Sequence, residues 1–314
     1  MSAVRIRRGA LGICVALVIL AGCTSWFPAL ELERAADLPT ARGSAGTDLL
    51  YVTGGCKGTC VLSYPSAKPR GSLDVAGAGL CSDKHGNVFV ATAASSGDAV
   101  VYEFGHGSTK PKATLNVPGD LAEGCSVDPT SGNLAVTYLC QDCSYGPVAV
   151  YRNAKGTPAT YEEPGVYLAY CGYDSEGDLF ADGNSSSGFA LVELSAGRSA
   201  LRALSVNQSI TFAGQVQWDG IYLAIEDLSH PVIYRFKISG STATRKGTTQ
   251  LAGAGKFGAQ SWIQDNTVIV PFSPKGSTPV EVGYWKYPAG GTATKVVKKP
   301  LGTATLAGVT VSVR

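Results

Sequence analysis

The chain has 314 residues, of which 45% are hydrophobic and 16% are charged, so it has enough apolar material for a large core and is not intrinsically disordered. Its 39 glycines and 16 prolines, with a single methionine, favour many turns and few long helices, which is typical of an all-β protein. Basic and acidic residues nearly balance, 26 against 24, and such a chain has little electrostatic attraction for nucleic acid, which excludes that class of partner.

Residues 1 to 22 have the pattern of an export signal. Three arginines among the first eight residues form a basic start, and the apolar run that follows is too short to span a bilayer comfortably. The run ends in the letters LAGC at residues 20 to 23, which resemble a bacterial lipobox. The resemblance implies cleavage before Cys23, a diacylglyceryl group on its thiol and an acyl chain such as palmitate on its new amino terminus. A plain secretory peptide, cleaved near the same small residues, is the alternative.

A lipidated Cys23 would anchor the mature chain firmly, since each buried methylene contributes about 0.8 kcal/mol. Thr24 follows it, and because no aspartate stands there to signal retention in the inner membrane, the predicted destination is the outer membrane. Removal of residues 1 to 22 takes three arginines away and leaves 23 basic against 24 acidic residues, so the mature chain stays close to neutral. Residues 23 to 47 mix charges with proline, glycine, serine and alanine, and they predict a tether.

From residue 48 onward the sequence consists of short strands separated by turns, and one unit repeats. GLCSDKHGNVFVAT, which begins at Gly79, returns as EGCSVDPTSGNLAVT from Glu123 and as YCGYDSEGDLFAD from Tyr170. More divergent copies begin at Val216 and Trp262. A fixed period of this length indicates a repeat architecture. The aspartates of its turn lie 45, 46, 45 and 46 residues apart, at Asp83, Asp128, Asp174, Asp219 and Asp265.

Each period predicts four strands, which the second period shows most clearly at residues 78–82, 88–92, 99–104 and 113–117. The turn between its first two strands has an aspartate at the first position and a glycine where a positive φ is needed. The third strand recurs six times, which predicts six blades. The predicted third strands span residues 61–64, 100–104, 148–151, 190–194, 232–236 and 282–287.

The two ends of the repeat region predict closure. The first period begins at its second strand, residues 48–53, and the chain finishes with an apolar segment at 306–313 that has no partner strand after it. The C-terminal strand therefore supplies the missing first strand of blade one, which removes the open sheet edges. The sequence predicts an all-β domain over residues 48–314, a six-bladed β-propeller of four-stranded blades.

The unit that begins at Gly79 resembles the first two strands and turn of NHL-type six-bladed β-propellers, and of the related gluconolactonase and streptogramin-lyase group. The resemblance covers nearly the whole mature domain and implies the propeller fold. Its motifs are architectural, blades five and six depart from the Gly-Asn turn, and the Asp-Pro and Asn-Arg steps of many such repeats are absent after the second strand. The resemblance therefore implies a fold more strongly than an activity.

The five turn aspartates could form a ring of carboxylates, but they lie between first and second strands, whereas propeller ligands bind at the opposite rim. We interpret them as turn caps.

Residues just past the second strands and at the entry to the first strands form the opposite rim, where chemistry is expected. The second-strand ends offer Thr53, Thr92, Thr137, Asp182, Ile225 and Pro271, and the first-strand entries add Tyr167 and Gln215. The candidate ligand-binding residues are Glu123, Asp182, Asn184, Gln217, Glu226, Asp227, Gln260 and Trp262.

Three of these candidates suggest a metal site. If Glu123, Asp182 and Glu226 converge, with Asn184 beside them, their oxygens could hold Ca²⁺ or another divalent cation, as the resemblance to lactonase-like propellers implies. The alternative is that they are scattered loop residues facing water. A ring of threonines and glutamines suits sugars or peptides equally well.

Seven cysteines besides Cys23 remain after processing, and in an exported chain their expected state is disulfide. The short spacings of Cys56 with Cys60, and of Cys140 with Cys143, predict two loop disulfides. An odd count leaves at least one thiol unpaired, unless a partner protein supplies another cysteine. Equivalent places on successive first strands, lining the channel, are predicted for Cys81, Cys125 and Cys171.

Redox and zinc chemistry are not expected of the cysteines, because no helix N-terminus is predicted near them and four ligands would have to meet across non-adjacent blades. Among the histidines, His85 and His106 are predicted to be solvated turn residues. His230 lies on the functional rim and is the one candidate general base, which a mechanism like that of the streptogramin lyases would require.

Three functions remain open from the sequence. The first is a lipid-anchored cell-envelope module that binds a ligand or protein, its partners being the membrane through the anchor and an envelope protein, peptide or carbohydrate. The second is a lyase or lactonase-like enzyme that uses a divalent cation or His230. The third is a structural scaffold of the envelope.

Overall fold

The computed structural model of the chain describes residues 47–140, 145–274, 278–298, 301 and 305–314, all within one compact unit. The predicted signal peptide, Cys23, nearly all of the tether and Cys143 lie outside these residues. Among the residues described, no helix is long and apolar enough to cross a membrane. The predictions of export and lipidation therefore stay predictions.

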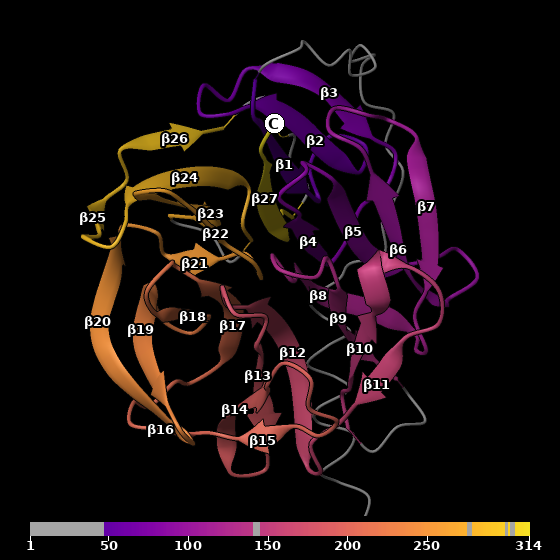
Figure 1. Cartoon of the computed structure of the whole chain (residues 1–314). Helices are drawn as coiled ribbons and strands as arrows, with labels where there is room; N and C mark the ends of the chain where they lie inside the picture. The colour runs from indigo at the N-terminus through magenta and orange to yellow at the C-terminus, as the bar shows by residue number, and fades with distance from the viewer. Residues whose placement is uncertain (1–46, 141–144, 275–277, 299–300, 302–304) are drawn as a thin grey trace, which may run out of the picture. The chain divides into compact units, whose positions relative to one another are not determined.

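Six antiparallel sheets are arranged around a common axis, with their first strands innermost (Figure 1). The predicted closure is present, because the C-terminal strand β27 pairs with β1 so that Leu50 lies opposite Val311. The predicted six-bladed β-propeller is thus confirmed. Blade 1 contains β27 (Gly308–Ser312), β1 (Leu49–Thr53), β2 (Thr59–Ser63) and β3 (Pro69–Leu73).

Blades 2 to 4 follow the predicted four-strand pattern. Blade 2 contains β4 (Gly79–Ser82), β5 (Val88–Ala93), β6 (Ala99–Phe104) and β7 (Pro111–Asn116). Blade 3 contains β8 (Leu121–Val127), β9 (Leu134–Leu139), β10 (Val148–Tyr151), the short 3₁₀ helix η1 (Arg152–Ala154) and β11 (Ala159–Tyr161). Blade 4 contains β12 (Val166–Tyr173), β13 (Leu179–Ser185), β14 (Gly188–Leu194) and β15 (Arg202–Ala203).

Blades 5 and 6 depart from the simple pattern. The outer edge of β20, an 11-residue strand, is covered by the short parallel strands β16 and β25, which protects a long edge from pairing with other chains. Blade 5 contains β16 (Ser205–Val206), β17 (Ala213–Trp218), β18 (Leu223–Asp227), β19 (Val232–Ser239) and β20 (Thr242–Ala252). Blade 6 contains β21 (Lys256–Phe257), β22 (Trp262–Gln264), β23 (Thr267–Ser273), β24 (Glu281–Lys286) and β26 (Lys295–Val297), while β25 (Gly291–Thr292), between β24 and β26 in the chain, pairs with β20 of blade 5.

The turn aspartates cap the first hairpin of their blades. Asp83 Oδ1 accepts the backbone N–H groups of His85 and Asn87 at 2.9 and 2.8 Å. Asp128, Asp174 and Asp219 accept equivalent amides in blades 3 to 5, whereas Asp265 has a left-handed φ of 52°. The interpretation of the first four as turn caps is confirmed.

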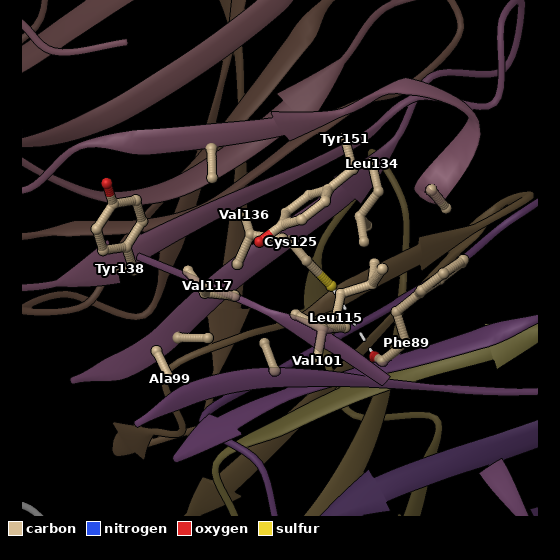
Figure 2. Close-up of a cluster of buried hydrophobic side chains, with 14 of the residues drawn as sticks. Phe89, Ala99, Val101, Leu115, Val117, Cys125, Leu134, Val136, Tyr138 and Tyr151 are labelled. Carbon is tan, nitrogen blue, oxygen red and sulfur yellow. Dashed lines mark hydrogen bonds between the residues drawn. The ribbon is translucent and has the colours of Figure 1, made fainter. Parts of the chain in front are cut away.

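The core lies between neighbouring blades. Figure 2 shows the apolar cluster between blades 2 and 3, where Phe89 and Leu115 of one blade face Leu134 and Val136 of the next. Each large apolar side chain buried in this way contributes about 1.5–3 kcal/mol. The Tyr151 hydroxyl, at the edge of the cluster, donates to the Asn116 carbonyl of blade 2 at 2.7 Å.

His106 differs from its prediction as a solvated turn residue. Its Nδ1 lies 2.7 Å from Ser312 Oγ in β27, and its Nε2 lies 3.2 Å from the Thr47 carbonyl oxygen, just before β1. The imidazole thus joins blade 2 to both closing strands. His85 is exposed in its turn, as predicted.

The cysteines also differ in part from the prediction. The loop disulfide Cys56–Cys60 is present, and Cys140 is disulfide-bonded, but its predicted partner Cys143 lies outside the described residues. A second described disulfide, which the sequence did not predict, joins Cys81 of β4 to Cys125 of β8. These two side chains are buried in the cluster between blades, so they do not line a channel.

Cys171 is a buried free cysteine at the equivalent place on β12. Burial raises the pKa of its thiol, and Asp182 raises it further. The thiol therefore stays protonated and unreactive at neutral pH.

The Cys81–Cys125 disulfide is expected to stabilise the protein more than the loop disulfide. It closes a segment with a sequence separation of 44, against 4 for Cys56–Cys60, and chain entropy then predicts losses of about 4 and about 2 kcal/mol when the bonds are removed. Urea unfolding of the two alanine double variants, Cys81→Ala/Cys125→Ala and Cys56→Ala/Cys60→Ala, measures this difference. Equal losses from the two pairs would show that the inter-blade bond does not restrict the unfolded chain in this way.

Candidate functional site

The innermost strands of three consecutive blades carry β-bulges at the same rim. The pairing register shifts between Ala122 and Cys125 in β8, between Leu168 and Tyr170 in β12, and between Ala213 and Val216 in β17. Bulges of this kind re-aim side chains and are frequent beside functional sites. The second-strand residues at these bulges are Thr137, Asp182 and Glu226.

Glycines make two of the bulges possible. A Cβ on Gly124 would lie 2.9 Å from Thr137 Oγ1, and a Cβ on Gly214 would lie 2.8 Å from the Glu226 carbonyl oxygen. A glycine within a strand often marks a bulge. Gly124 and Gly214 were therefore the sequence signals for this geometry, which the strand pattern alone missed.

A threonine at this position satisfies the fold. In blade 3, Thr137 Oγ1 accepts the N–H of Gly124 at 2.9 Å and donates to the Ala169 carbonyl of blade 4 at 2.6 Å. Thr53 of blade 1 makes the same double contact with the backbone of Gly77 at 2.6 and 2.9 Å. A hydroxyl suits this place because it both donates and accepts.

Asp182 in blade 4 and Glu226 in blade 5 occupy the position that Thr137 occupies in blade 3, so a carboxyl replaces the threonine hydroxyl there. Both side chains are fully buried, and none of their four oxygens has a hydrogen-bond partner among the described residues. The backbone amides of Gly214 and Tyr170 near Asp182 lower its pKa, and the Ser261 hydroxyl with the backbone amides of Gln215 and Ser261 lowers that of Glu226, although none of these groups reaches hydrogen-bond geometry. The site thus contains two carboxyls that the fold leaves unpaired.

Burial determines the ionisation of this pair. It raises the pKa of Asp182 well above its usual range, and it raises the pKa of Glu226 to about 8. The Glu226 charge raises the pKa of Asp182 further. At neutral pH the protonated form of each carboxyl is therefore favoured.

Glu123 and Tyr170 belong to the same site. Burial raises the pKa of the Tyr170 phenol, and the charges of Glu123, Asp182 and Glu226 raise it further, so all three carboxyls act electrostatically on this one side chain. Glu123 Oε2 accepts the Tyr167 hydroxyl at 2.6 Å, which partly offsets the effect of burial and leaves the pKa of Glu123 at about 7. The three carboxyls predicted from sequence thus share an electrostatic effect on Tyr170.

Their arrangement does not fit the calcium-type site that we considered. No group of three or more histidine, cysteine, aspartate or glutamate side chains in the described part of the chain is placed to hold a metal ion. Calcium takes six to eight oxygen ligands around one point. We therefore derive no chemistry through a metal here.

Two glutamines add unpartnered buried atoms to the same rim. Gln215 lies in the bulge of β17 with its backbone amide near Glu226; its Nε2 donates to the Val216 carbonyl at 2.9 Å, but its Oε1 has no partner among the described residues. Gln260 precedes Ser261; its Oε1 accepts the Leu80 N–H at 2.6 Å, and its Nε2 is unpartnered. Among the described residues, Asp182, Glu226, Gln215 and Gln260 therefore leave five acceptor oxygens and one donor nitrogen unsatisfied.

Other predicted ligand residues are used by the fold. Gln217 Nε2 donates to the Ile263 carbonyl at 2.8 Å and its Oε1 accepts the Ile263 N–H at 2.7 Å, which joins β17 to β22. Trp262 Nε1 donates to Gln264 Oε1 at 3.3 Å, and its ring is half-buried. Asn184 is half-buried opposite Tyr167 in the β12–β13 pair.

Asp227 stabilises, through hydrogen bonds, the loop that contains His230, the candidate general base. It accepts the backbone N–H groups of Thr211, Phe212 and Ser229 at 3.0–3.2 Å, and its Oδ2 lies 3.0 Å from His230 Nδ1. The His230 side chain is 59% exposed. Asp227 thus holds this loop together, and it orients an imidazole that faces solvent.

Comparison with known proteins supports the fold and nothing finer. No protein-family model matches the sequence, and no curated protein matches it. A chain of the nidogen/laminin complex matches with 12% identity and a TM-score of 0.59, covering 85% of this chain and 99% of that one. A protein of unknown function from Bacteroides caccae matches with 11% identity and a TM-score of 0.59, with 85% and 99% covered.

The β-propeller domain of Cps50 (Swd1) from Myceliophteria thermophila matches with 11% identity and a TM-score of 0.56, covering 85% of this chain and 90% of that one. At these identities the likeness shows the propeller fold alone. The resemblance to NHL-type repeats stays a prediction.

Proposed function

We propose that this chain is a lipid-anchored binding module of the bacterial cell envelope, whose ligand binds at the bulged rim of blades 3 to 5. The observation that carries the proposal is the pair of buried, unpartnered carboxyls of Asp182 and Glu226. The fold is compatible with such a role, because one propeller of similar structure was solved in a nidogen/laminin complex.

The free-energy cost of burying Asp182 and Glu226 without hydrogen-bond partners favours a binding site over a structural scaffold, because a scaffold has no need of these carboxyls. A buried polar group without a hydrogen bond costs about 1–3 kcal/mol, and a charged one costs more. Thr137, at the equivalent place, shows that a hydroxyl fulfils the structural need of the position. Two costly carboxyls in adjacent blades are therefore explained by a ligand that pairs with them, since proteins depart from such local rules mainly at functional sites.

The enzymatic alternative has one supporting contact, the hydrogen bond between His230 and Asp227. Asp227 is already committed to three backbone amides, and its pairing with His230 is explained by the loop that they hold together. Binding without catalysis is the function that the geometry supports best.

The location and the partner class of the module come from the sequence. The LAGC letters at residues 20–23 support lipidation at Cys23, and the tether up to residue 47 would hold the propeller away from the membrane. An envelope protein, a peptide or a carbohydrate is the partner class that such a position offers.

Substitution with threonine, the residue found in blade 3, tests the binding site. Immobilised peptides and glycans are screened against the wild type and against the double variant Asp182→Thr/Glu226→Thr, with the exposed Asp98→Thr as a control for the loss of an acidic residue. The double variant is expected to fold at least as stably as the wild type and to lose at least about tenfold in affinity for every wild-type ligand. Unchanged binding by the double variant would remove the site from these blades.

A further inference from the structure

Hydrogen-bond acceptors outnumber donors among the unsatisfied side-chain atoms of the site. They comprise five acceptor oxygens, on Asp182, Glu226 and Gln215, and a single donor nitrogen on Gln260. All four side chains are at least nine-tenths buried, Gln215 being 5% exposed. The charged side chains that act most strongly on the two pKa values are acidic, Glu226 on Asp182 and Asp227 on Glu226, and none of the ion pairs among the described residues involves Asp182 or Glu226. Once ionised, the two carboxyls become acceptors only, and an occupant with donors and a positive charge would then complement them.

From this balance we infer that the site binds a protonated primary amine, carried by a lysine side chain or by the amino terminus of a peptide. The inference rests on the proposed function and names the chemical group that the module recognises. An ammonium group has three N–H donors and no acceptor, which matches three acceptor side chains from β13, β17 and β18. Its positive charge compensates the carboxyls, which have no basic partner of their own.

Other occupants fit less well. A hard divalent cation needs at least six oxygens around one point, and the described residues do not bring three metal-binding side chains together. A neutral sugar brings no charge to balance an ionised carboxyl. The unpartnered Gln260 Nε2 is the one group that calls for an acceptor, and a peptide carbonyl beside the amine would supply it.

Binding of an amine is linked to proton release. The ligand arrives as R–NH₃⁺, the protonated carboxyl of Glu226 gives its proton to the buffer, and a carboxylate–ammonium pair remains. Such charge-assisted hydrogen bonds are stronger than neutral ones, and they replace a state in which the oxygens have no partner. Asp182 undergoes the same exchange, so one to two protons leave for each amine bound near pH 7.

Calorimetry of the mature protein tests the inference. The probes are a short N-acetylated peptide with one lysine, the same peptide with norleucine in place of lysine, a lysine-free peptide with a free amino terminus, CaCl₂ and a neutral disaccharide. Each is titrated at pH 7 in PIPES and in imidazole, which contain no primary amine and whose different ionisation enthalpies reveal proton release. The variants are Glu226→Gln and Asp182→Asn, with the exposed Glu176→Gln as the matched control.

The expected result is that an amine probe binds with release of protons, and that Glu226→Gln or Asp182→Asn weakens it at least about 30-fold while Glu176→Gln does not. Binding of the lysine peptide or of the free amino terminus tells which source is used, and either supports the inference. Binding of CaCl₂ or the disaccharide alone, with the same dependence on Glu226, would overturn the amine and leave the proposed function intact. If no probe depends on Asp182 or Glu226, the amine is excluded, and the threonine double variant decides separately on the proposed function.

Discussion

Replacement of Glu226 by glutamine is expected to stabilise the protein at pH 9 and to have little effect at pH 4. Burial raises the pKa of Glu226 from 4.5 to about 8, so between these values the folded state holds a proton that the unfolded state has lost. Stability therefore falls as the pH rises from about 4.5 to about 8, and it stays low above that. Below pH 4.5 both states are protonated and the group contributes no pH dependence.

The size of this effect follows from the shift. One pKa unit corresponds to about 1.4 kcal/mol, so the ionised glutamate costs on the order of 5 kcal/mol above pH 8. For a domain of this size the variant should then melt roughly 10 °C or more above the wild type at pH 9. Scanning calorimetry at pH 4, 6 and 9 measures the difference, with Glu176→Gln as a control. A difference that did not change with pH would mean that Glu226 ionises normally.

Replacement of Asp219 by alanine is expected to destabilise the protein by about 3–5 kcal/mol. Its Oδ2 accepts Arg235 Nε and the Tyr287 hydroxyl, both at 2.7 Å, while its Oδ1 caps the turn. The Asp219 and Arg235 side chains are 2% and 17% exposed, and the guanidinium lies 4.7 Å from the centre of the Tyr222 ring. The variant would leave a largely buried arginine without its counter-ion, which is among the costliest changes in a core.

The same turn in blade 4 gives the matched control. Asp174 caps its turn through the amides of Glu176 and Asp178, and no ion pair to it is found among the described residues. Asp174→Ala should therefore cost only about 1 kcal/mol. Urea unfolding of the two variants gives both free energies, and similar losses would show that the Arg235 pair adds nothing to the turn.

The fold could be predicted because its signals are local. The turn around Asp83 depends on side-chain and backbone contacts within four residues, and such turns recur at a fixed period. Blade number, strand order and closure by the C-terminal strand follow from that period. Contacts between blades produce no local sequence pattern, because they join residues far apart in the chain. The hydrogen bonds from Thr137 to Ala169 and from Leu80 to Gln260 span 32 and 180 residues.

The site could be predicted only in part for the same reason. Glu123, Asp182 and Glu226 were identified by their place at strand ends, and in the structure all three raise the pKa of Tyr170. Tyr170 itself was missed, because it reads as an ordinary strand residue. The Cys81–Cys125 bond was missed because equivalent places in neighbouring blades do not reveal a Cα separation of 5.6 Å.

The protonation of the two carboxyls can be measured directly by carbon-detected NMR of the side-chain carboxyl resonances between pH 4 and 10. In the free protein one resonance should titrate near pH 8 and disappear in Glu226→Gln. A second, from Asp182, should titrate far above the usual range of an aspartate and disappear in Asp182→Asn. If every carboxyl of the propeller titrated below pH 5.5, Asp182 and Glu226 would be ordinary paired or hydrated acids. That result would contradict the proposal that the rim of blades 3 to 5 is the binding site.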